Sequence, residues 1–164
     1  MTLFVTKRET PIGEVVARRS ERGLVSMRFS DGKTDVSADR VDPDPAVGDA
    51  IDRYFAGSTA ALDELTVDAD GTPLQQQIWC LLRSIPPGET RSYAALGAEV
   101  GTSGRVVGNA MSANPVCLAL PCHRVIRSDG TWHGYAYGND RKRWLLAHEA
   151  EIRTPSGPVD PLGE

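Results

Sequence analysis

The chain has 164 residues, 40% hydrophobic and 24% charged, which suits one compact domain or two small ones with a real core. The formal net charge of -4 argues against a generally basic nucleic-acid binder, and no run approaches the roughly 18 apolar residues of a membrane span. The amino terminus lacks the basic and apolar regions of a secretory signal, which predicts a cytoplasmic location.

The charges are unevenly distributed along the chain. Residues 1–70 carry 14 acidic and 9 basic side chains, whereas residues 71–164 carry 8 acidic and 9 basic ones. The second half could therefore face an anion, although ordinary surface variation explains the difference as well.

The first 70 residues predict an α/β domain built on a small antiparallel sheet. Turn signals at Thr10–Gly13 and Glu21–Gly23 separate three strand-like segments, and Asp70-Gly71 marks the boundary of the domain. The predicted elements are strands at residues 3–6, 14–18 and 24–29, a polar loop at 31–44, a helix at 45–56 and a further strand at 62–68.

The second predicted domain, residues 71–153, is mostly helical. Thr72, Pro73 and Gln75 form a capping box at the start of an amphipathic helix. Two short helices follow at 93–100 and 104–113, and the Gly-containing turn between them is typical of a helix-turn-helix.

A core-packed pair of helices would explain the same spacing. Arg105 argues against that alternative, because a buried unpaired charge is costly. The second helix also has a small face, made of Gly104, Gly108, Ala110 and Ser112, which would let its backbone approach a DNA groove closely.

The remaining elements surround an aromatic loop. The sequence predicts a short strand at 125–127, a pocket-lining loop at 132–138, a helix at 141–151 capped by Asp140, and a disordered tail at 154–164.

The pentapeptide Pro121-Cys122-His123-Arg124-Val125 places a thiol beside an imidazole and a guanidinium. A thiol is a good nucleophile only as the thiolate, and such neighbours lower its pKa. A buried cysteine that only fills the core would fit this short motif equally well. Glu149, in the last amphipathic helix, is the best candidate for a carboxylate that orients His123.

The cysteine and histidine pattern predicts neither a disulfide framework nor a metal site. The three Cys (Cys80, Cys117 and Cys122) are an odd number, and none forms a metal-ligand pair with the three His. The sequence therefore predicts no metal and no cofactor.

From Gln75 to Glu149 the chain resembles the O6-alkylguanine-DNA alkyltransferases, also called methylated-DNA–protein-cysteine methyltransferases. The combination of motifs and their spacing is specific, and about half of the chain is covered strongly. The matching blocks are Ser92-Tyr93, Arg105–Met111, Asn114-Pro115, Pro121–Val125, Gly134-Tyr135 and Leu145–Glu149.

The resemblance implies a reaction and a role for each site residue. Cys122 would accept the alkyl group irreversibly, so that each molecule acts once. His123 would deprotonate it through a bridging water, and Glu149 would hold His123. Tyr93 would donate a proton to N3 of the leaving guanine, and Asn114 would fix the turn before the Cys segment.

The resemblance also implies how the base is held. The carbonyl of Val125 and the amide near Tyr135 would read the guanine edge, in a pocket that also includes Ala136, Tyr137 and Cys117. Tyr137 stands where the family commonly has Gly, and Asn139 where it commonly has an apolar residue. A narrowed pocket that transfers methyl but accepts benzyl groups poorly is therefore expected.

The implied partner is double-stranded DNA containing alkylated guanine, mainly O6-methylguanine, with O4-methylthymine as a further candidate. The second helix of the helix-turn-helix would enter the minor groove, and Arg105 would fill the gap left by the flipped base. The other implied DNA-contacting residues are Tyr93, Gly104, Gly108, Ala110, Met111 and Arg124.

The resemblance implies an α+β fold, with a ribonuclease H-like first domain packed on a second domain that carries a winged-helix-like helix-turn-helix. It implies a monomer without membrane attachment and leaves cooperative binding along DNA open. Two other functions are considered. Non-catalytic alkyltransferase-like proteins bind alkylguanine but typically replace the acceptor Cys, whereas a thiol hydrolase would turn over repeatedly.

Overall fold

The computed structural model describes residues 2–132 and 134–153, with side chains up to residue 151. The chain forms two compact units. Unit 1 comprises Met1–Asp70 together with Pro115–Ala119, and unit 2 comprises Gly71–Asn114 and Leu120–Glu164. A short piece that follows the helix-turn-helix thus belongs with the first 70 residues.

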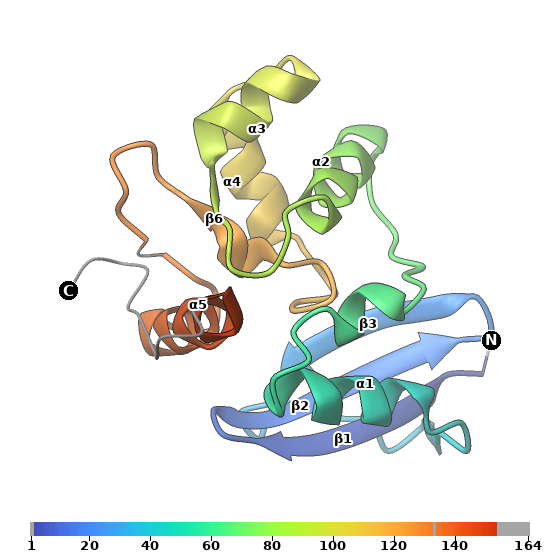
Figure 1. Ribbon diagram of the computed structural model, residues 1–164. Helices are drawn as coiled ribbons and strands as arrows, with labels where there is room; N and C mark the ends of the chain where they lie inside the picture. Colours follow the sequence, from blue (N-terminus) through green and yellow to red (C-terminus); the bar gives the residue numbers. More distant parts are fainter. Residues whose placement is uncertain (1, 133, 154–164) are drawn as a thin grey trace. The chain divides into compact units, whose positions relative to one another are not determined.

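Unit 1 is built on a four-stranded sheet with the order β3-β2-β1-β4 (Figure 1). Its first three strands form the predicted antiparallel meander, and β4, which lies in the predicted polar loop, pairs with β1 in parallel. The strands are β1 (Phe4–Thr10), β2 (Gly13–Ser20), β3 (Gly23–Phe29) and β4 (Arg40–Val41). Gly23 has a φ of 147°, and a Cβ there would lie 2.7 Å from the Thr66 carbonyl oxygen, so this turn requires glycine.

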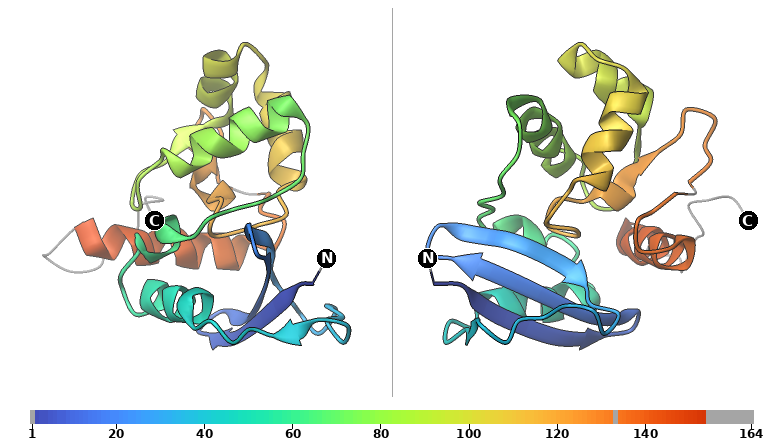
Figure 2. Two further views of the ribbon diagram at one scale, coloured as in Figure 1. Left: turned by 90° about the vertical axis from the view of Figure 1, so that its right-hand side faces the viewer. Right: turned by 180° about the vertical axis from the view of Figure 1, so that it is seen from behind.

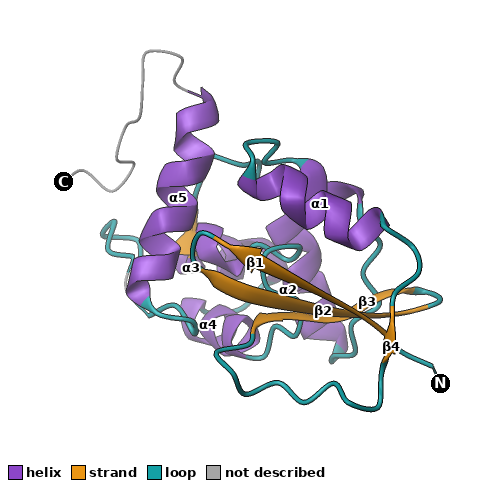
Figure 3. Ribbon diagram, turned by 90° about the horizontal axis from the view of Figure 1, so that it is seen from below, coloured by secondary structure: helices purple, strands orange, loops and turns teal. Residues whose placement is uncertain are grey.

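Helix α1 (Ala46–Phe55) covers one face of this sheet (Figures 1 and 3) and buries Val47, Ile51 and Tyr54. The strand predicted at 62–68 is wrong in its first half. Leu62 lies instead within the 3-10 helix η1 (Ala61–Glu64), and this single helical turn buries its side chain. Only the later part of that segment meets the sheet, where Val67 pairs with Leu24.

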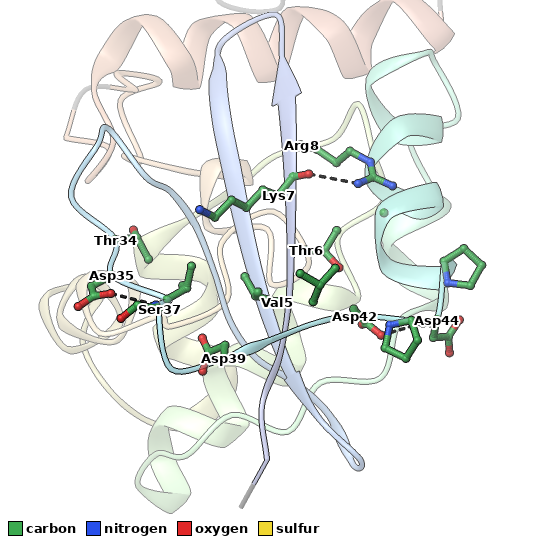
Figure 4. Close-up of a pocket in the computed structure, with 15 residues that line it drawn as sticks. Val5, Thr6, Lys7, Arg8, Thr34, Asp35, Ser37, Asp39, Asp42 and Asp44 are labelled. Carbon is green, nitrogen blue, oxygen red and sulfur yellow. Dashed lines mark hydrogen bonds between the residues drawn. The ribbon is translucent and has the colours of Figure 1, made fainter.

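The acidic loop before α1 is fixed to the sheet by ion pairs. Arg18 donates to both carboxylate oxygens of Asp39, at 2.7 and 3.1 Å, and Arg19 holds Asp42 in the same two-point manner. Both aspartates border an open cavity of about 770 Å³ beside β1 (Figure 4). Part of the negative charge of the first half is therefore already neutralised within unit 1.

Unit 2 begins with α2 (Pro73–Arg83), and the predicted capping box of Thr72 and Gln75 is confirmed. The two short helices (Figure 2) are α3 (Tyr93–Val100) and α4 (Gly104–Ser112). Gly101, between them, is in the left-handed conformation. The Trp79 indole N–H donates to the Ala110 carbonyl at 3.0 Å, which fastens α2 to α4.

A small parallel pair and a long helix complete unit 2. β5 (Arg91–Ser92), which the sequence did not predict, pairs with β6 (Val125–Ile126). The 3-10 helix η2 (Cys122–Arg124) leads into β6, and α5 (Asn139–Arg153) begins one residue before the predicted cap Asp140. The predicted disordered tail at 154–164 lies outside the described residues. In the part of the chain that the structure describes, no helix is long and apolar enough to cross a membrane.

Candidate active site

Cys122 opens onto a small cavity in unit 2. The cavity has a volume of about 50 Å³, room for one or two water molecules at about 30 Å³ each. Helices α3, α4 and α5 and the aromatic loop all contribute to its wall. Its lining residues are Tyr93, Gly108, Met111, Ser112, Cys122, Gly134, Tyr135, Ala136 and Lys142.

Local structure brings Tyr93 beside Cys122. The Ser92 side chain accepts from the Ala95 N–H and starts α3 at Tyr93. Because Ser92 also pairs with Ile126, the start of α3 is held next to the segment that follows Cys122. Burial, and then the neighbouring Cys122, raise the pKa of Tyr93, so its hydroxyl stays protonated and can donate.

A fully buried carboxylate lies behind the thiol segment. Glu149, from α5, is 0% exposed and accepts two N–H bonds from Arg124, at 2.8 and 2.9 Å. His123 Nε2 lies 2.8 Å from Oε2 of the same carboxylate. Burial alone would raise the pKa of Glu149, but His123 and Arg124 outweigh it and hold that pKa well below its usual range.

The ionised carboxylate determines the state of the imidazole. An ionised carboxylate can only accept, so His123 carries its proton on Nε2 and leaves the Nδ1 lone pair free to accept one. Burial lowers the pKa of His123 more than Glu149 raises it, which keeps the ring neutral. His123 Nδ1 is buried and has no hydrogen-bond partner among the described residues.

The resting thiol is protonated, contrary to the expectation that His123 and Arg124 lower its pKa. Burial raises the pKa of Cys122, which is only 8% exposed, while a hydrogen bond from Asn114 and the charge of Lys142 oppose that shift. His123 and Arg124 are both turned to Glu149 instead. The thiol therefore needs a base before it can attack.

Lys142 also lies at the cavity, and the sequence analysis did not select it. It is buried, it lines the cavity with Cys122, and its ammonium donates to the Val125 carbonyl at 2.7 Å. Burial lowers the pKa of Lys142 to about 8. A lysine in a charged stretch of a helix gives no signal in the sequence, but its position seven residues before Glu149 places both on one face of α5.

Two residues assigned to DNA contact are corrected by the structure. Arg124 is 1% exposed, and besides its two bonds to Glu149 it donates to the Ile85 carbonyl at 2.8 Å, so it cannot reach DNA. Ala110 is buried against α2, where its carbonyl accepts from Trp79.

The glycines in the small face of α4 serve internal packing. A Cβ on Gly104 would lie 3.2 Å from the Ala94 amide nitrogen, and one on Gly108 would meet the Tyr93 ring at 4.0 Å. These glycines let α3 and α4 approach each other and leave room for Tyr93. Met111 is likewise buried and lines the cavity. The exposed stripe of α4 instead consists of Arg105, Asn109 and Ser112.

The aromatic loop reaches the cavity through two of its predicted residues. Tyr135 and Ala136 line it, whereas Tyr137 packs edge-on against the Tyr135 ring with centroids 5.6 Å apart. Cys117 is buried in unit 1 and is not among the lining residues. Within the described ranges, no three His, Cys, Asp or Glu side chains are grouped to hold a metal ion.

The fold and the site define a two-unit α+β protein. Its site contains a buried thiol, the neutral imidazole of the next residue, and an ionised carboxylate that contacts this imidazole. Residues 73–151 match the family model described as 6-O-methylguanine DNA methyltransferase, DNA binding domain. The methylated-DNA–protein-cysteine methyltransferase of Mycobacterium tuberculosis is 37% identical over 158 residues, covering 93% of each chain. The chain belongs to the methylated-DNA–protein-cysteine methyltransferase family.

Solved structures and a second relative agree with this assignment. The crystal structure of Mycobacterium tuberculosis O6-methylguanine methyltransferase superposes with a TM-score of 0.79 at 32% identity, over 91% of this chain and 93% of that one. That organism's OGT in complex with DNA gives 0.79 over 99% of each chain. The Salmonella typhimurium methyltransferase is 47% identical over 108 residues, 65% of this chain, which spans only 63% of that relative's length.

Proposed function

We propose that this protein repairs DNA by moving the alkyl group of O6-alkylguanine, mainly O6-methylguanine, irreversibly to its own Cys122. The observation that carries this proposal is a buried thiol that faces a cavity and is backed by the neutral His123 and the ionised Glu149. The family relationship supports the same activity. A non-catalytic binder would not need an acceptor thiol with a base behind it.

The chemistry follows from the protonation states. His123 Nδ1 takes the thiol proton, through a bridging water, while Glu149 stabilises the imidazolium that forms. Sγ of Cys122 then attacks the alkyl carbon, and the C–O6 bond breaks as the S–C bond forms. Tyr93, held protonated, donates to N3 of the leaving guanine, and the thiol proton restores the Tyr93 hydroxyl. The thioether does not hydrolyse, so the protein is consumed.

Mass spectrometry tests this proposal directly. The protein is incubated with a duplex containing O6-methylguanine, and the peptide that contains Cys122 is weighed. We expect one methyl per molecule, absent in Cys122→Ser. Tight binding without a mass gain would identify a non-catalytic binder, and multiple turnovers would identify a thiol hydrolase.

We propose that α4 enters the minor groove of the duplex with its exposed stripe of Arg105, Asn109 and Ser112. The cavity of about 50 Å³ is too small for a base. The aromatic loop that lines it must therefore move outward when a flipped base enters. Arg105 is exposed at the start of α4, where it can fill the space that the base leaves.

Replacement of Arg105 separates base flipping from chemistry. Arg105→Ala is expected to slow repair of duplex DNA by about 10- to 100-fold, because unstacking a base costs a few kcal/mol. Reaction with free O6-methylguanine should stay near the wild-type rate, since no base is flipped. Single-turnover rates on both substrates provide the measurement, and an equal loss on both would remove Arg105 from this role.

We propose that Tyr137 restricts the pocket through Tyr135, whose ring it contacts. The base would be read by the Val125 carbonyl and the amide near Tyr135, with Ala136 beside it. Lys142 already donates to that carbonyl, which keeps it in place.

Tyr137→Gly is expected to raise the benzyl-to-methyl rate ratio about 10-fold, because removing the ring lets Tyr135 move away from the thiol. The ratio is measured with free O6-benzylguanine and O6-methylguanine. Trp132→Gly, in the same loop, is the matched control, and a ratio that does not respond to Tyr137→Gly would refute the restriction.

We further propose that residues 1–70 form a ribonuclease H-like domain, an assignment supported by the sheet order β3-β2-β1-β4 with parallel β1 and β4. Residues 71–153 would form the DNA-binding and alkyl-acceptor domain with a winged-helix-like helix-turn-helix. The protein would act as a cytoplasmic monomer, and sedimentation with and without DNA would detect any cooperative binding.

A further inference from the structure

The segment between α4 and Cys122 follows an unusual path. The chain passes into unit 1 at Pro115 and returns to unit 2 at Leu120, only two residues before the thiol. Its residues are all nearly inaccessible to solvent: Val116, Cys117, Leu118, Ala119 and Leu120. Such burial of a connecting segment requires that its backbone polar groups find partners.

The first part of this segment is fixed to the edge of the sheet. The Met27 N–H donates to the Pro115 carbonyl at 3.0 Å, and the Cys117 N–H donates to the Met27 carbonyl at 2.9 Å. Val116 is thereby paired in parallel with Met27 on β3. This pairing fixes the backbone up to Cys117.

A tight turn centred on Leu118 follows. The Ala119 N–H donates to the Cys117 carbonyl at 2.8 Å, and Leu118 has a φ of 70°. A three-residue turn with positive φ is rare and strained for an L-residue, and glycine would adopt it without cost. The Leu118 side chain is only 2% exposed, so packing holds the residue in this conformation.

A second turn of the opposite hand ends at the thiol residue itself. The Cys122 N–H donates to the Leu120 carbonyl at 2.8 Å, and Pro121 at the centre has φ -78° and ψ 69°. These angles define the common inverse γ-turn, which the proline ring favours. The Asn114 side chain donates to the same Leu120 carbonyl at 2.8 Å.

We propose that these two consecutive turns position Cys122 for alkyl transfer, with Leu118 as a positioning residue. This inference rests on the proposed function. In-line attack on a carbon tolerates little displacement, and a misplacement of about 1 Å can cost about 100-fold in rate. A branched L-residue held at positive φ has few neighbouring conformations of similar energy. The turn therefore limits displacement of the backbone that leads to the thiol.

The test compares Leu118→Ala with Leu118→Gly, two variants that both lose the buried side chain. Glycine relaxes the turn, so Leu118→Gly should be the more stable in urea, the reverse of the usual order. Glycine also allows the turn to adopt other backbone conformations. The single-turnover methyl-transfer rate of Leu118→Gly should therefore be about 10-fold below that of Leu118→Ala. The pH dependence of the rate should be the same in both variants.

Val116→Ala and Val116→Gly are the matched controls, since Val116 lies in the same buried segment but in an extended pairing. At this position the alanine variant should be the more stable in urea. It should also have the higher methyl-transfer rate of the two. A Leu118→Gly rate equal to or above that of Leu118→Ala would refute the positioning role.

Pro121→Ala keeps the test decisive if neither Leu118 variant folds. It frees φ at the centre of the second turn, and we expect a rate about 10-fold lower with an unchanged pH dependence. A wild-type rate in Pro121→Ala would overturn the inference. Absence of methyl transfer in the wild-type protein would instead overturn the proposed function, and the stability order at Leu118 can be measured without DNA.

Discussion

Glu149→Gln should destabilise the protein by about 3–5 kcal/mol and slow alkyl transfer by about 100- to 10,000-fold. The change keeps the shape of the side chain but leaves the buried Arg124 guanidinium without a compensating charge. The amide can also donate to His123 Nε2, which would move the ring proton to Nδ1 and remove the lone pair that accepts the thiol proton. Urea unfolding and single-turnover repair measure the two losses separately.

Glu64→Gln provides the matched control. Glu64 also accepts from an arginine, Arg53, at 2.9 Å, but both side chains are exposed to solvent. An exposed pair of this kind contributes little to stability, so neither the unfolding midpoint nor the repair rate should change. Equal effects of the two substitutions would show that burial of the Glu149 cluster is unimportant.

The same cluster predicts how stability responds to acid. The pKa of His123 is lowered in the folded state, so its contribution is complete above the ordinary value of 6.5 and declines as the pH falls below it. The pKa of Glu149 is also lowered, so its contribution declines below the ordinary value of 4.5. The wild-type protein should therefore lose stability in two stages on acidification, and Glu149→Gln should lack the second.

The sequence predicted the helices of unit 2 better than the connections. The capping box at Thr72 and the two short helices have clear local signals, because caps and glycine turns act over a few residues. β5 has only two residues, and its formation depends on Val125 and Ile126, more than 30 positions away. No local pattern predicts such a pair.

The sequence predicted the contact between His123 and Glu149 but not the charges that surround it. His123 and Glu149 meet as expected at 2.8 Å. The resemblance implied a DNA contact for Arg124, whereas here Arg124 is buried and Glu149 compensates its charge. The turn at Leu118 was equally unforeseeable, since leucine gives no signal for positive φ.

Lys142→Met should slow alkyl transfer by about 10- to 100-fold at pH 7, because Lys142 is the nearby cation that favours the thiolate of Cys122. Methionine fills nearly the same space, although it leaves the Val125 carbonyl without the ammonium donor. The change therefore raises the pKa of Cys122 further, so less thiolate forms at a given pH.

The pH dependence separates this charge effect from a loss of packing. The pKa of Lys142 is about 8, so the wild-type residue loses its own charge above that pH while thiolate formation becomes easier. The rate deficit of Lys142→Met should then shrink from pH 7 to pH 9.5. Lys142→Arg keeps its charge throughout this range. The difference in rate between Lys142→Arg and Lys142→Met should therefore not shrink as the pH rises. A deficit of constant size across this range would mean that Lys142 acts through the Val125 carbonyl alone.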